Sequence, residues 1–242
     1  MCEVRTKMDS KAESCLRYAD GEGGLNLVSA SYGSQGIGAR ISCAISPSQY
    51  GLILVGATDH GICWLGLHES AAYLESELRR DFSRAEVVHN DDMLRDITAR
   101  VIAFIRGPEE PVYFPLDIRA TPFQLSVWRE LCAIPLGSTR SYSEIARRLG
   151  QPSAARAVGH ANGSNPLAIL IPCHRAVAAD GQLTGYRWGL AYKRRLLEYE
   201  RLIADRRGSS TAEVNGALSS NLIQLRNRPS SIDDKRRASR ER

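Results

Sequence analysis

The sequence predicts an α/β protein of the α+β type, in which a small antiparallel-sheet domain precedes a helical domain. Short apolar runs separated by turn residues occupy residues 40–68, and apolar residues recur at helical spacing from Thr121 onward. The chain has 242 residues, 43% of them hydrophobic, which suffices for one large core or two small ones. We therefore expect an N-terminal α/β domain over residues 39–118 and a helical domain over residues 119–204.

The N-terminal domain is expected to begin with a three-stranded antiparallel meander. Its apolar runs are separated by the turn residues Pro47-Ser48-Gln49 and Thr58-Asp59-His60-Gly61. Two stretches with helical spacing and one extended stretch follow. In chain order, the predicted strands, helices and extended stretch are Ile41–Ile45, Leu52–Val55, Ile62–Leu67, Ala72–Phe82, Leu94–Ile105 and Val112–Ile118.

Capping signals organise the helical domain. Thr121 precedes Pro122, a residue favoured at the first position of a helix. Ser141 and Glu144 have the spacing of a capping box, and Ser153 is expected to cap the next short helix, which is rich in small residues. Two short helices around a glycine-containing turn predict a helix-turn-helix. A last helix is expected over Ala191–Ile203.

The two ends of the chain carry weaker structural signals. Residues 1–38 are glycine-rich without periodicity and suggest a flexible arm, whereas residues 205–242 are rich in Arg and Ser and suggest a disordered basic tail. No apolar run approaches the roughly 20 residues that span a bilayer, and no signal peptide is apparent, so we expect a cytoplasmic protein without a membrane partner. The six cysteines form no C-x-x-C pair, which favours free thiols in a reducing compartment.

The most informative segment ends in Pro172-Cys173-His174-Arg175, after an apolar run. A thiol reacts as a thiolate and needs a base or a positive field, which His174 and Arg175 could supply. The alternative is that Cys173 is a small buried hydrophobe.

A carboxylate in the last helix favours the catalytic interpretation. Glu200 shares the apolar stripe of Tyr192, Leu196 and Ile203, and a buried carboxylate requires a partner. With His174 as that partner, a Glu–His–Cys arrangement would activate the thiol, directly or through a water. The alternative is that Glu200 reaches solvent near the helix end.

These residues and several further landmarks resemble the O6-alkylguanine-DNA alkyltransferases, in particular their Ada/Ogt-type bacterial members. The resemblance runs from about Arg40 to Ile203 and includes the Pro-Cys-His-Arg motif preceded by Asn165-Pro166. The other landmarks are Pro122 through Trp128, Ile134 through Gly137, Ser141-Tyr142, Ala155 through Val158 and Gly185 through Gly189. The resemblance implies an RNase H-like N-terminal domain and a winged-helix-like catalytic domain.

The resemblance also implies roles for single residues. Cys173 would be the alkyl acceptor, His174 the base acting through a water, and Glu200 its partner. Asn165 would be a hinge residue, and Tyr142 would donate a proton to the leaving guanine, unless it is a core aromatic with a solvated hydroxyl. The guanine pocket is expected to include Tyr186, Arg187, Trp188, Ile171 and Pro172, although Arg187 and Trp188 could equally serve packing.

The helix-turn-helix would bind the minor groove of double-stranded DNA with little sequence specificity. Arg156 would enter the stack in place of an extruded nucleotide, unless it is a solvated helix charge. Small residues would let the helix approach the DNA closely. The expected DNA-binding set is Arg156, Ser141, Ser153, Ala155, Ala157 and Gly159. The net charge of +5 fits a polyanionic partner only loosely.

The implied reaction is direct repair of O6-alkylguanine, and also of O4-alkylthymine, by one irreversible transfer to Cys173 without a cofactor. We expect a monomer and no metal, because Gly56-Ala57 and Cys63 stand where some relatives carry zinc ligands, and His60, His68 and His89 restore no ligand pattern. The 38 N-terminal residues are too few for an upstream activator domain, which predicts repair without transcriptional activation. Two alternatives are a lesion-binding module without transfer and a Cys–His hydrolase.

Overall fold

The computed structural model describes residues 15–19, 22–26, 30–107 and 112–206. Residues up to Arg201 belong to one compact unit, and Leu202 begins a second. The expected division at residues 118/119 therefore lies within a single compact unit and remains an interpretation.

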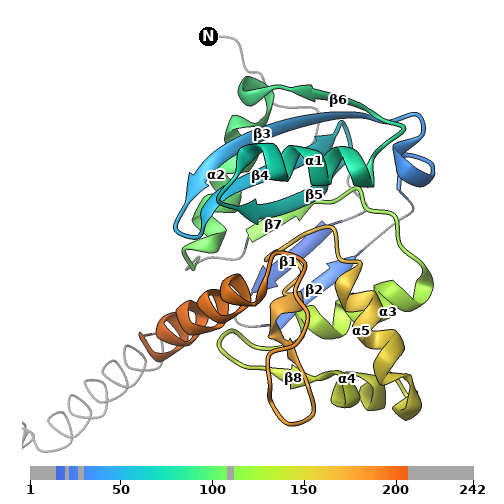
Figure 1. The fold of residues 1–242 in the computed structure, drawn as a ribbon, viewed down its shortest axis with the longest axis vertical. Coiled ribbons are helices and arrows are strands. Elements are labelled where there is room, and N and C mark those ends of the chain that lie inside the picture. The colour runs from blue at the N-terminus through green and yellow to red at the C-terminus, as the bar shows by residue number, and fades with distance from the viewer. Residues whose placement is uncertain (1–14, 20–21, 27–29, 108–111, 207–242) are drawn as a thin grey trace, which may run out of the picture. The chain divides into compact units, whose positions relative to one another are not determined.

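A four-stranded sheet forms the centre of the N-terminal half (Figure 1). β3 (Arg40–Ser48), β4 (Gly51–Thr58) and β5 (Gly61–His68) form the predicted antiparallel meander. β6 (Glu86–His89) adds a parallel strand beside β3, giving the order β5-β4-β3-β6. β6 was not predicted from the sequence, because four residues with only two central valines carry too little periodic signal.

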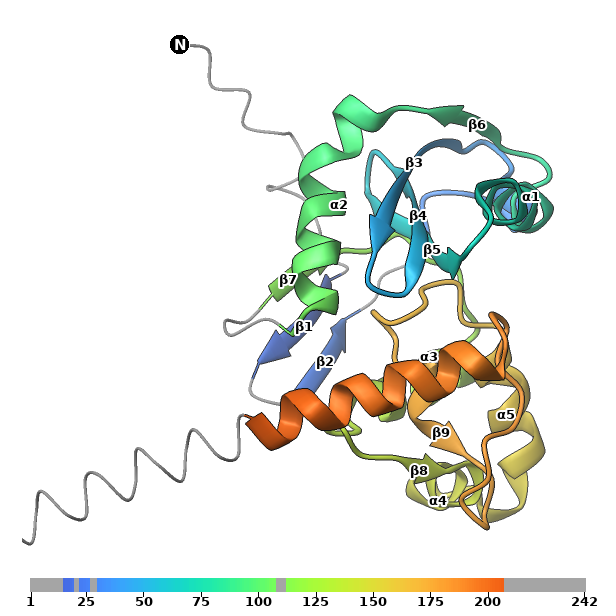
Figure 2. The ribbon, with the colours of Figure 1, turned by 60° about the vertical axis from the view of Figure 1, so that its left-hand side comes forward.

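Two helices cover opposite faces of this sheet, as Figure 2 shows. α1 (Ala71–Asp81) begins at Ser70, whose hydroxyl accepts from the backbone N–H of Tyr73. α2 (Asp91–Ile105) begins at Asn90, whose side chain accepts from the N–H of Met93. Because both faces of the sheet are covered, β4 and β5 are long buried runs and not alternating ones.

The expectation of a flexible arm over residues 1–38 is wrong where the structure describes that segment. β1 (Cys15–Ala19) and β2 (Glu22–Asn26) form a second sheet with β7 (Val112–Pro115) in the order β2-β1-β7, and Ser34–Gly36 form a 3-10 turn, η1. β1 pairs with a strand almost a hundred residues away, a relation that no local pattern reports. β7 falls within the predicted extended stretch. Residues 1–14, 20–21 and 27–29 lie outside the described residues.

The helical half begins as its capping signals predict. Thr121 and Gln124 form a capping box at the start of α3 (Pro122–Cys132), and Ser141 and Glu144 do the same for α4 (Tyr142–Arg148). Gly150, with a φ of 71°, ends α4 in the left-handed conformation. β8 (Arg140–Ser141) precedes α4 and pairs in parallel with β9 (Ala176–Val177).

Ser153 does not cap the next helix. It lies inside a 3-10 turn, η2 (Pro152–Ala154), so that α5 (Ala155–Gly163) begins one residue later without a side-chain cap. The proline starts a turn of its own and moves the helix start past Ser153. The two helices around this turn agree with the predicted helix-turn-helix, and Gly163 ends the second of them.

The last helix covers residues 190–206 of the described chain. It includes Asp205 and Arg206, which the sequence analysis assigned to a disordered tail; residues 207–242 lie outside the described residues. In the described ranges, no helix combines the length and the apolar character that crossing a bilayer requires.

The edge of the N-terminal sheet is joined to the segment that carries Cys173. The N–H of Leu65 in β5 donates to the carbonyl of Pro166 over 2.8 Å, and the N–H of Ala168 donates to the carbonyl of Leu65 over 2.9 Å. These backbone bonds hold the start of the apolar run against the sheet, so the N-terminal half helps to position the segment that leads to Cys173.

Candidate active site

The position of Cys173 is set by the buried segment that precedes it, residues 167–171. In this apolar run, Ile169 adopts a φ of 69°. A β-branched residue rarely enters this left-handed region, and such strain concentrates at functional sites. The run delivers Cys173, only 6% exposed, to the first position of a 3-10 turn, η3 (Cys173–Arg175).

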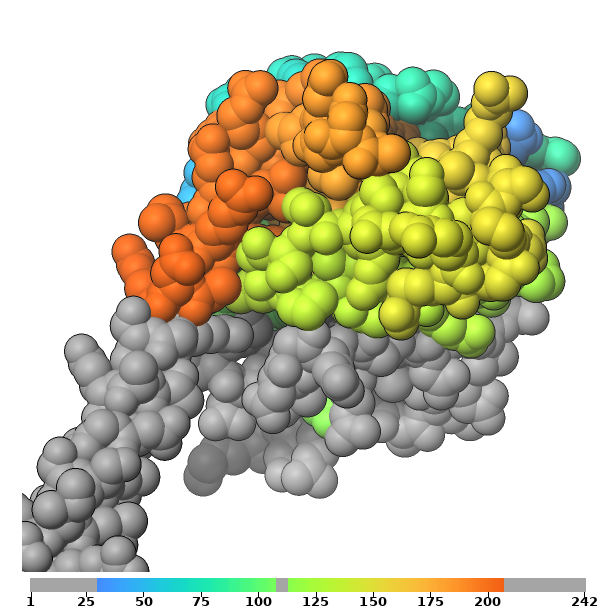
Figure 3. All heavy atoms as spheres, turned by 90° about the horizontal axis from the view of Figure 1, so that it is seen from below, coloured from blue at the N-terminus to red at the C-terminus, as the bar shows by residue number. Residues whose placement is uncertain are grey.

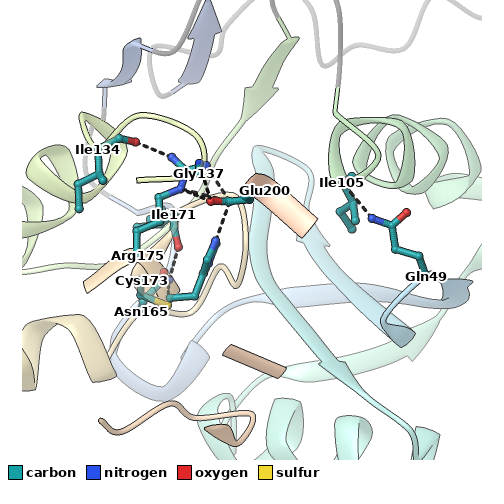
Figure 4. A network of polar contacts seen from close by, with 10 residues as sticks. Gln49, Ile105, Ile134, Gly137, Asn165, Ile171, Cys173, Arg175 and Glu200 are labelled. Atoms are coloured by element: carbon teal, nitrogen blue, oxygen red, sulfur yellow. Dashed lines mark hydrogen bonds and ion pairs between the residues drawn. The ribbon is translucent and has the colours of Figure 1, made fainter. Parts of the chain in front are cut away.

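The Asn165 side chain makes hydrogen bonds to several residues of this segment and to Cys173. Its side-chain N–H₂ lies 2.8 Å from the carbonyl oxygen of Ile171 and 3.1 Å from Cys173 Sγ, as Figure 4 shows. Its side-chain oxygen accepts from the N–H of Leu167 over 2.9 Å. The predicted hinge residue therefore contacts the thiol itself and donates toward the sulfur.

Glu200 is buried and binds both residues that follow the cysteine. Its Oε1 lies 2.7 Å from His174 Nε2, and Arg175 makes a two-pronged contact with it, Nε to Oε2 at 2.9 Å and Nη2 to Oε1 at 2.8 Å (Figure 4). Since Glu200 is 6% exposed, the alternative of a solvent-reaching carboxylate is wrong. The predicted Glu–His pairing is present in the structure.

Charge pairing sets the ionisation of this group. Burial raises the pKa of Glu200, but His174 and Arg175 outweigh that effect and hold it at about 2. Burial lowers the pKa of His174 even though Glu200 opposes the shift. A neutral imidazole that donates from Nε2 to Glu200 keeps its lone pair on Nδ1, and His174 Nδ1 has no hydrogen-bond partner among the described residues.

Lys193 is a cation whose charge lowers the pKa of the Cys173 thiol, and it was not predicted from the sequence. Burial raises the pKa of Cys173, while the hydrogen bond from Asn165 and the charge of Lys193 lower it. Lys193 is fully buried, donates to the carbonyl of Thr184 over 2.8 Å, and has a pKa lowered by burial to about 8. Its position seven residues before Glu200, on the same buried stripe, is the signal that could have revealed it.

Arg175, which the sequence suggested as a source of positive field for the thiol, binds Glu200 and a backbone carbonyl. Besides its contact with Glu200, its Nη1 donates to the carbonyl of Ile134 over 2.6 Å. The guanidinium thus fixes the carboxylate and the loop after α3, and Lys193 is the charge that favours the thiolate.

A cavity of about 390 Å³ opens at Cys173. Of the residues predicted for the guanine pocket, Tyr186, Arg187 and Trp188 line this cavity. Ile171 and Pro172 do not line it, because they are buried in the segment that leads to the cysteine. The lining residues of the cavity are Arg80, Tyr142, Gly159, Asn162, Gly163, Asn165, Cys173, Gly185, Tyr186, Arg187 and Trp188.

Two tyrosines with different surroundings line this cavity. Burial raises the pKa of Tyr142, and a hydrogen bond with Thr184 opposes the shift. The hydroxyl of Tyr186 is buried without a hydrogen-bond partner among the described residues, and burial raises its pKa as well. Both hydroxyls therefore stay protonated near neutral pH and can act as donors.

The predicted DNA-binding residues fall into two groups. Arg156, Ala157 and Ser153 are exposed, and Ala155 and Gly159 are partly exposed. Ser141 is buried, and its hydroxyl is engaged with Glu144 at the start of α4, so its side chain is not available for DNA. In Figure 3 the yellow-green and yellow atoms of the helical half form one face, with the lighter orange atoms of the segment that follows Cys173 beside them.

Arg156 is free of protein partners within the described residues, where no hydrogen bond or ion pair involves it. Cys43, Cys63, Cys132 and Cys173 are buried free thiols. The described part of the chain holds no group of three or more His, Cys, Asp or Glu side chains arranged for a metal ion.

Comparison with known proteins connects this site to a family. The family described as "6-O-methylguanine DNA methyltransferase, DNA binding domain" matches residues 122–202. The bifunctional transcriptional activator/DNA repair enzyme Ada of Escherichia coli is 40% identical over 189 residues, which are 78% of this chain and 53% of Ada. The chain thus spans about half the length of that relative.

Shorter relatives match over most of their length. The methylated-DNA–protein-cysteine methyltransferase of Methanosarcina barkeri is 40% identical over 156 residues, 64% of this chain and 94% of that protein. The crystal structure of Mycobacterium tuberculosis OGT in complex with DNA aligns with a TM-score of 0.54 at 36% identity, over 66% of this chain and 93% of that one. This chain therefore belongs to the methylated-DNA–protein-cysteine methyltransferase family.

Proposed function

We propose that this protein repairs DNA by taking the alkyl group from O6-alkylguanine onto Cys173, which keeps it. The observation that carries the proposal is the position of Cys173 on the wall of a 390 Å³ cavity, next in the chain to a buried His174–Glu200 pair. Family membership supports the same reaction, because several relatives are named methylated-DNA–protein-cysteine methyltransferases.

The thiol is activated by proton transfer toward His174. The Nε2–H of His174 points to Glu200, which leaves Nδ1 as the base. In this proposal the thiol proton passes to Nδ1 through one water. Glu200 then stabilises the imidazolium. Asn165 and Lys193 stabilise the thiolate, whose formation burial would otherwise oppose.

The transfer is a direct displacement. The Cys173 sulfur forms a bond to the alkyl carbon as the bond from that carbon to O6 breaks, and the electron pair passes into the guanine. Tyr142 donates a proton to the leaving base, which offsets its developing charge. The thioether product is stable, so each molecule reacts once and needs no cofactor.

The alkylated base must leave the helix stack to reach the thiol. We propose that α5 lies in the minor groove of the duplex, where its small side chains permit close approach, and that Arg156 fills the vacated position. This binding mode uses shape and phosphates more than base sequence. O4-alkylthymine is a second substrate in the same proposal, and the protein acts as a cytoplasmic monomer.

Replacing Arg156 with Ala is expected to slow transfer from duplex DNA about a hundredfold, because extrusion of a base costs a few kcal/mol that the inserted side chain offsets. Transfer from free O6-alkylguanine base should be unchanged. Single-turnover rates on the two substrates check this. Arg147→Ala, which removes an exposed charge from α4, is the matched control and should lose much less.

The proposed function is tested with a duplex that carries one O6-methylguanine. Intact-mass measurement should show one methyl group replacing one hydrogen per protein molecule, and peptide analysis should place it on Cys173. Cys132→Ala removes another buried thiol and should leave the transfer intact. Saturable binding with no mass change would favour a lesion-binding module, and repeated turnover of an ester or a peptide would favour a Cys–His hydrolase.

A further inference from the structure

The cavity at Cys173 has one wall that is held by the N-terminal half of the protein. This wall is the loop that carries Arg187 and Trp188, and it lies against α1 and β5. The Arg187 guanidinium reaches α1, where its Nη2 lies 3.1 Å from Glu77 Oε2 and 2.7 Å from Asp81 Oδ2. The partners of Arg187 thus stand more than a hundred residues away in the chain.

An aromatic frame surrounds this ionic contact. The Arg187 guanidinium carbon lies 5.1 Å from the ring centre of Trp188 and 5.8 Å from that of Trp64. The two indoles meet edge to face, with centroids 5.4 Å apart at 90°. The indole N–H of Trp64 donates to Asp81 Oδ2 over 2.9 Å, so the same carboxylate oxygen receives both Trp64 and Arg187.

The Trp188 ring also packs against Gly66 of β5, where there is no room for a side chain. A Cβ built on Gly66 of β5 would stand 2.6 Å from the Trp188 ring and 2.5 Å from that of Trp64. Because Gly66 has no side chain, the Trp188 indole can pack directly against the backbone of β5. The cavity wall is therefore seated on β5 and tied to α1.

The ionic contact is largely withdrawn from water. The Arg187 side chain is 18% exposed and that of Glu77 is 8% exposed. Removing one partner of such a pair leaves a poorly solvated charge, which the loop can relieve only by moving toward solvent. Trp188, next in the chain, would move with it.

We propose that Arg187, held by Glu77 and Asp81, is a positioning residue that sets where Trp188 stands, so that the N-terminal half determines the width of the alkyl-accepting cavity. This inference rests on the proposed function for the identity of the ligand. Glu77 and Asp81 are outside the cavity lining, so they act on substrate choice through the lining residues that they bind. Arg187 is one of these; Arg80 is the other, with its Nη2 2.6 Å from Glu77 Oε2, and Arg187→Met tests the Arg187 contact without removing the partners of Arg80.

The test uses the double variant Glu77→Gln/Asp81→Asn in the full chain. Single-turnover rate constants are measured on duplexes with O6-methylguanine and with O6-butylguanine, at a temperature where every variant is fully folded. Glu75→Gln is the matched control, because Glu75 lies on the same helix and pairs with His89 at 3.4 Å instead of Arg187. Arg187→Met removes the other partner of the contact.

We expect the ratio of the two rate constants to change by about tenfold in the double variant and in Arg187→Met, because a misplacement of one ångström can cost about a hundredfold in rate and the wall is expected to move by less than that. Glu75→Gln should keep the wild-type ratio. An unchanged ratio in the double variant, or an equal fall of both rate constants, would show that the contact serves only folding and would overturn the inference.

Hydrogen–deuterium exchange of residues 185–189 gives a readout that does not depend on transfer. Exchange there should rise in the double variant and remain at the wild-type level in Glu75→Gln. A wild-type protein that accepts no alkyl group while this exchange responds would refute the proposed function and leave the positioning role standing. Unchanged exchange would refute the positioning role.

Discussion

Replacing Glu200 with Gln is expected to lower the free energy of unfolding by about 3–5 kcal/mol, the cost of breaking a buried ion pair by removal of one partner. The carboxylate binds His174 and Arg175 at once, and the Arg175 side chain is almost fully buried. Glutamine fills the same volume but removes the negative charge that His174 and Arg175 contact. Urea unfolding of the two proteins at neutral pH measures the difference.

Acid should reduce the difference in the free energy of unfolding between the wild type and Glu200→Gln. The pKa of Glu200 is about 2 in the folded protein and about 4.3 in an unfolded chain, so the carboxylate contributes stability that is fully present above the unfolded value. That contribution is lost as the pH falls toward 2, and the gap between wild type and variant should narrow over this interval. Glu198→Gln, an exposed change on the same helix, should alter stability by less than about 0.5 kcal/mol. A gap independent of pH would contradict the assignment.

Replacing Lys193 with Met is expected to slow transfer at pH 7 about a hundredfold, the usual effect of removing one preorganised electrostatic contact from a reacting centre. Lys193 is fully buried, and its charge lowers the pKa of a thiol that burial raises. Methionine fills the same space without the charge and leaves the hydrogen bond from Asn165 to the sulfur in place. Single-turnover transfer from an O6-methylguanine duplex measures the effect.

The pH dependence distinguishes this electrostatic role from packing. Because burial holds the pKa of Lys193 at about 8, its cation is present below that pH and is lost above it. The ratio of wild-type to variant rate should therefore be largest below pH 8 and should fall as the pH rises past it. Arg194→Met, an exposed change at the next residue, should keep the wild-type rate. A ratio that stays constant across pH 8 would mean that Lys193 acts through packing alone.

The candidate site around Cys173 shows how much of a site can be predicted from local sequence patterns. Cys173, His174 and Arg175 are consecutive, and Glu200 was identified because a carboxylate on an apolar stripe needs a partner. Lys193 lies on the same stripe and was not identified, although the same reasoning applies to a buried ammonium. The partner of Arg175 could not be predicted, since Glu200 and the carbonyl of Ile134 reach it from different segments.

The sequence by itself determined the elements whose signals are local. The caps at Thr121 and Ser141, the meander of β3 to β5 and the helical spacing of α2 each depend on residues within a few positions of one another. Only the tertiary structure decided the pairing of β1 with β7, the parallel strand β6 and the attachment of Arg187 to Glu77. Each of these joins segments far apart in the chain, and such contacts depend on the packing of the whole unit, which no short stretch of sequence encodes.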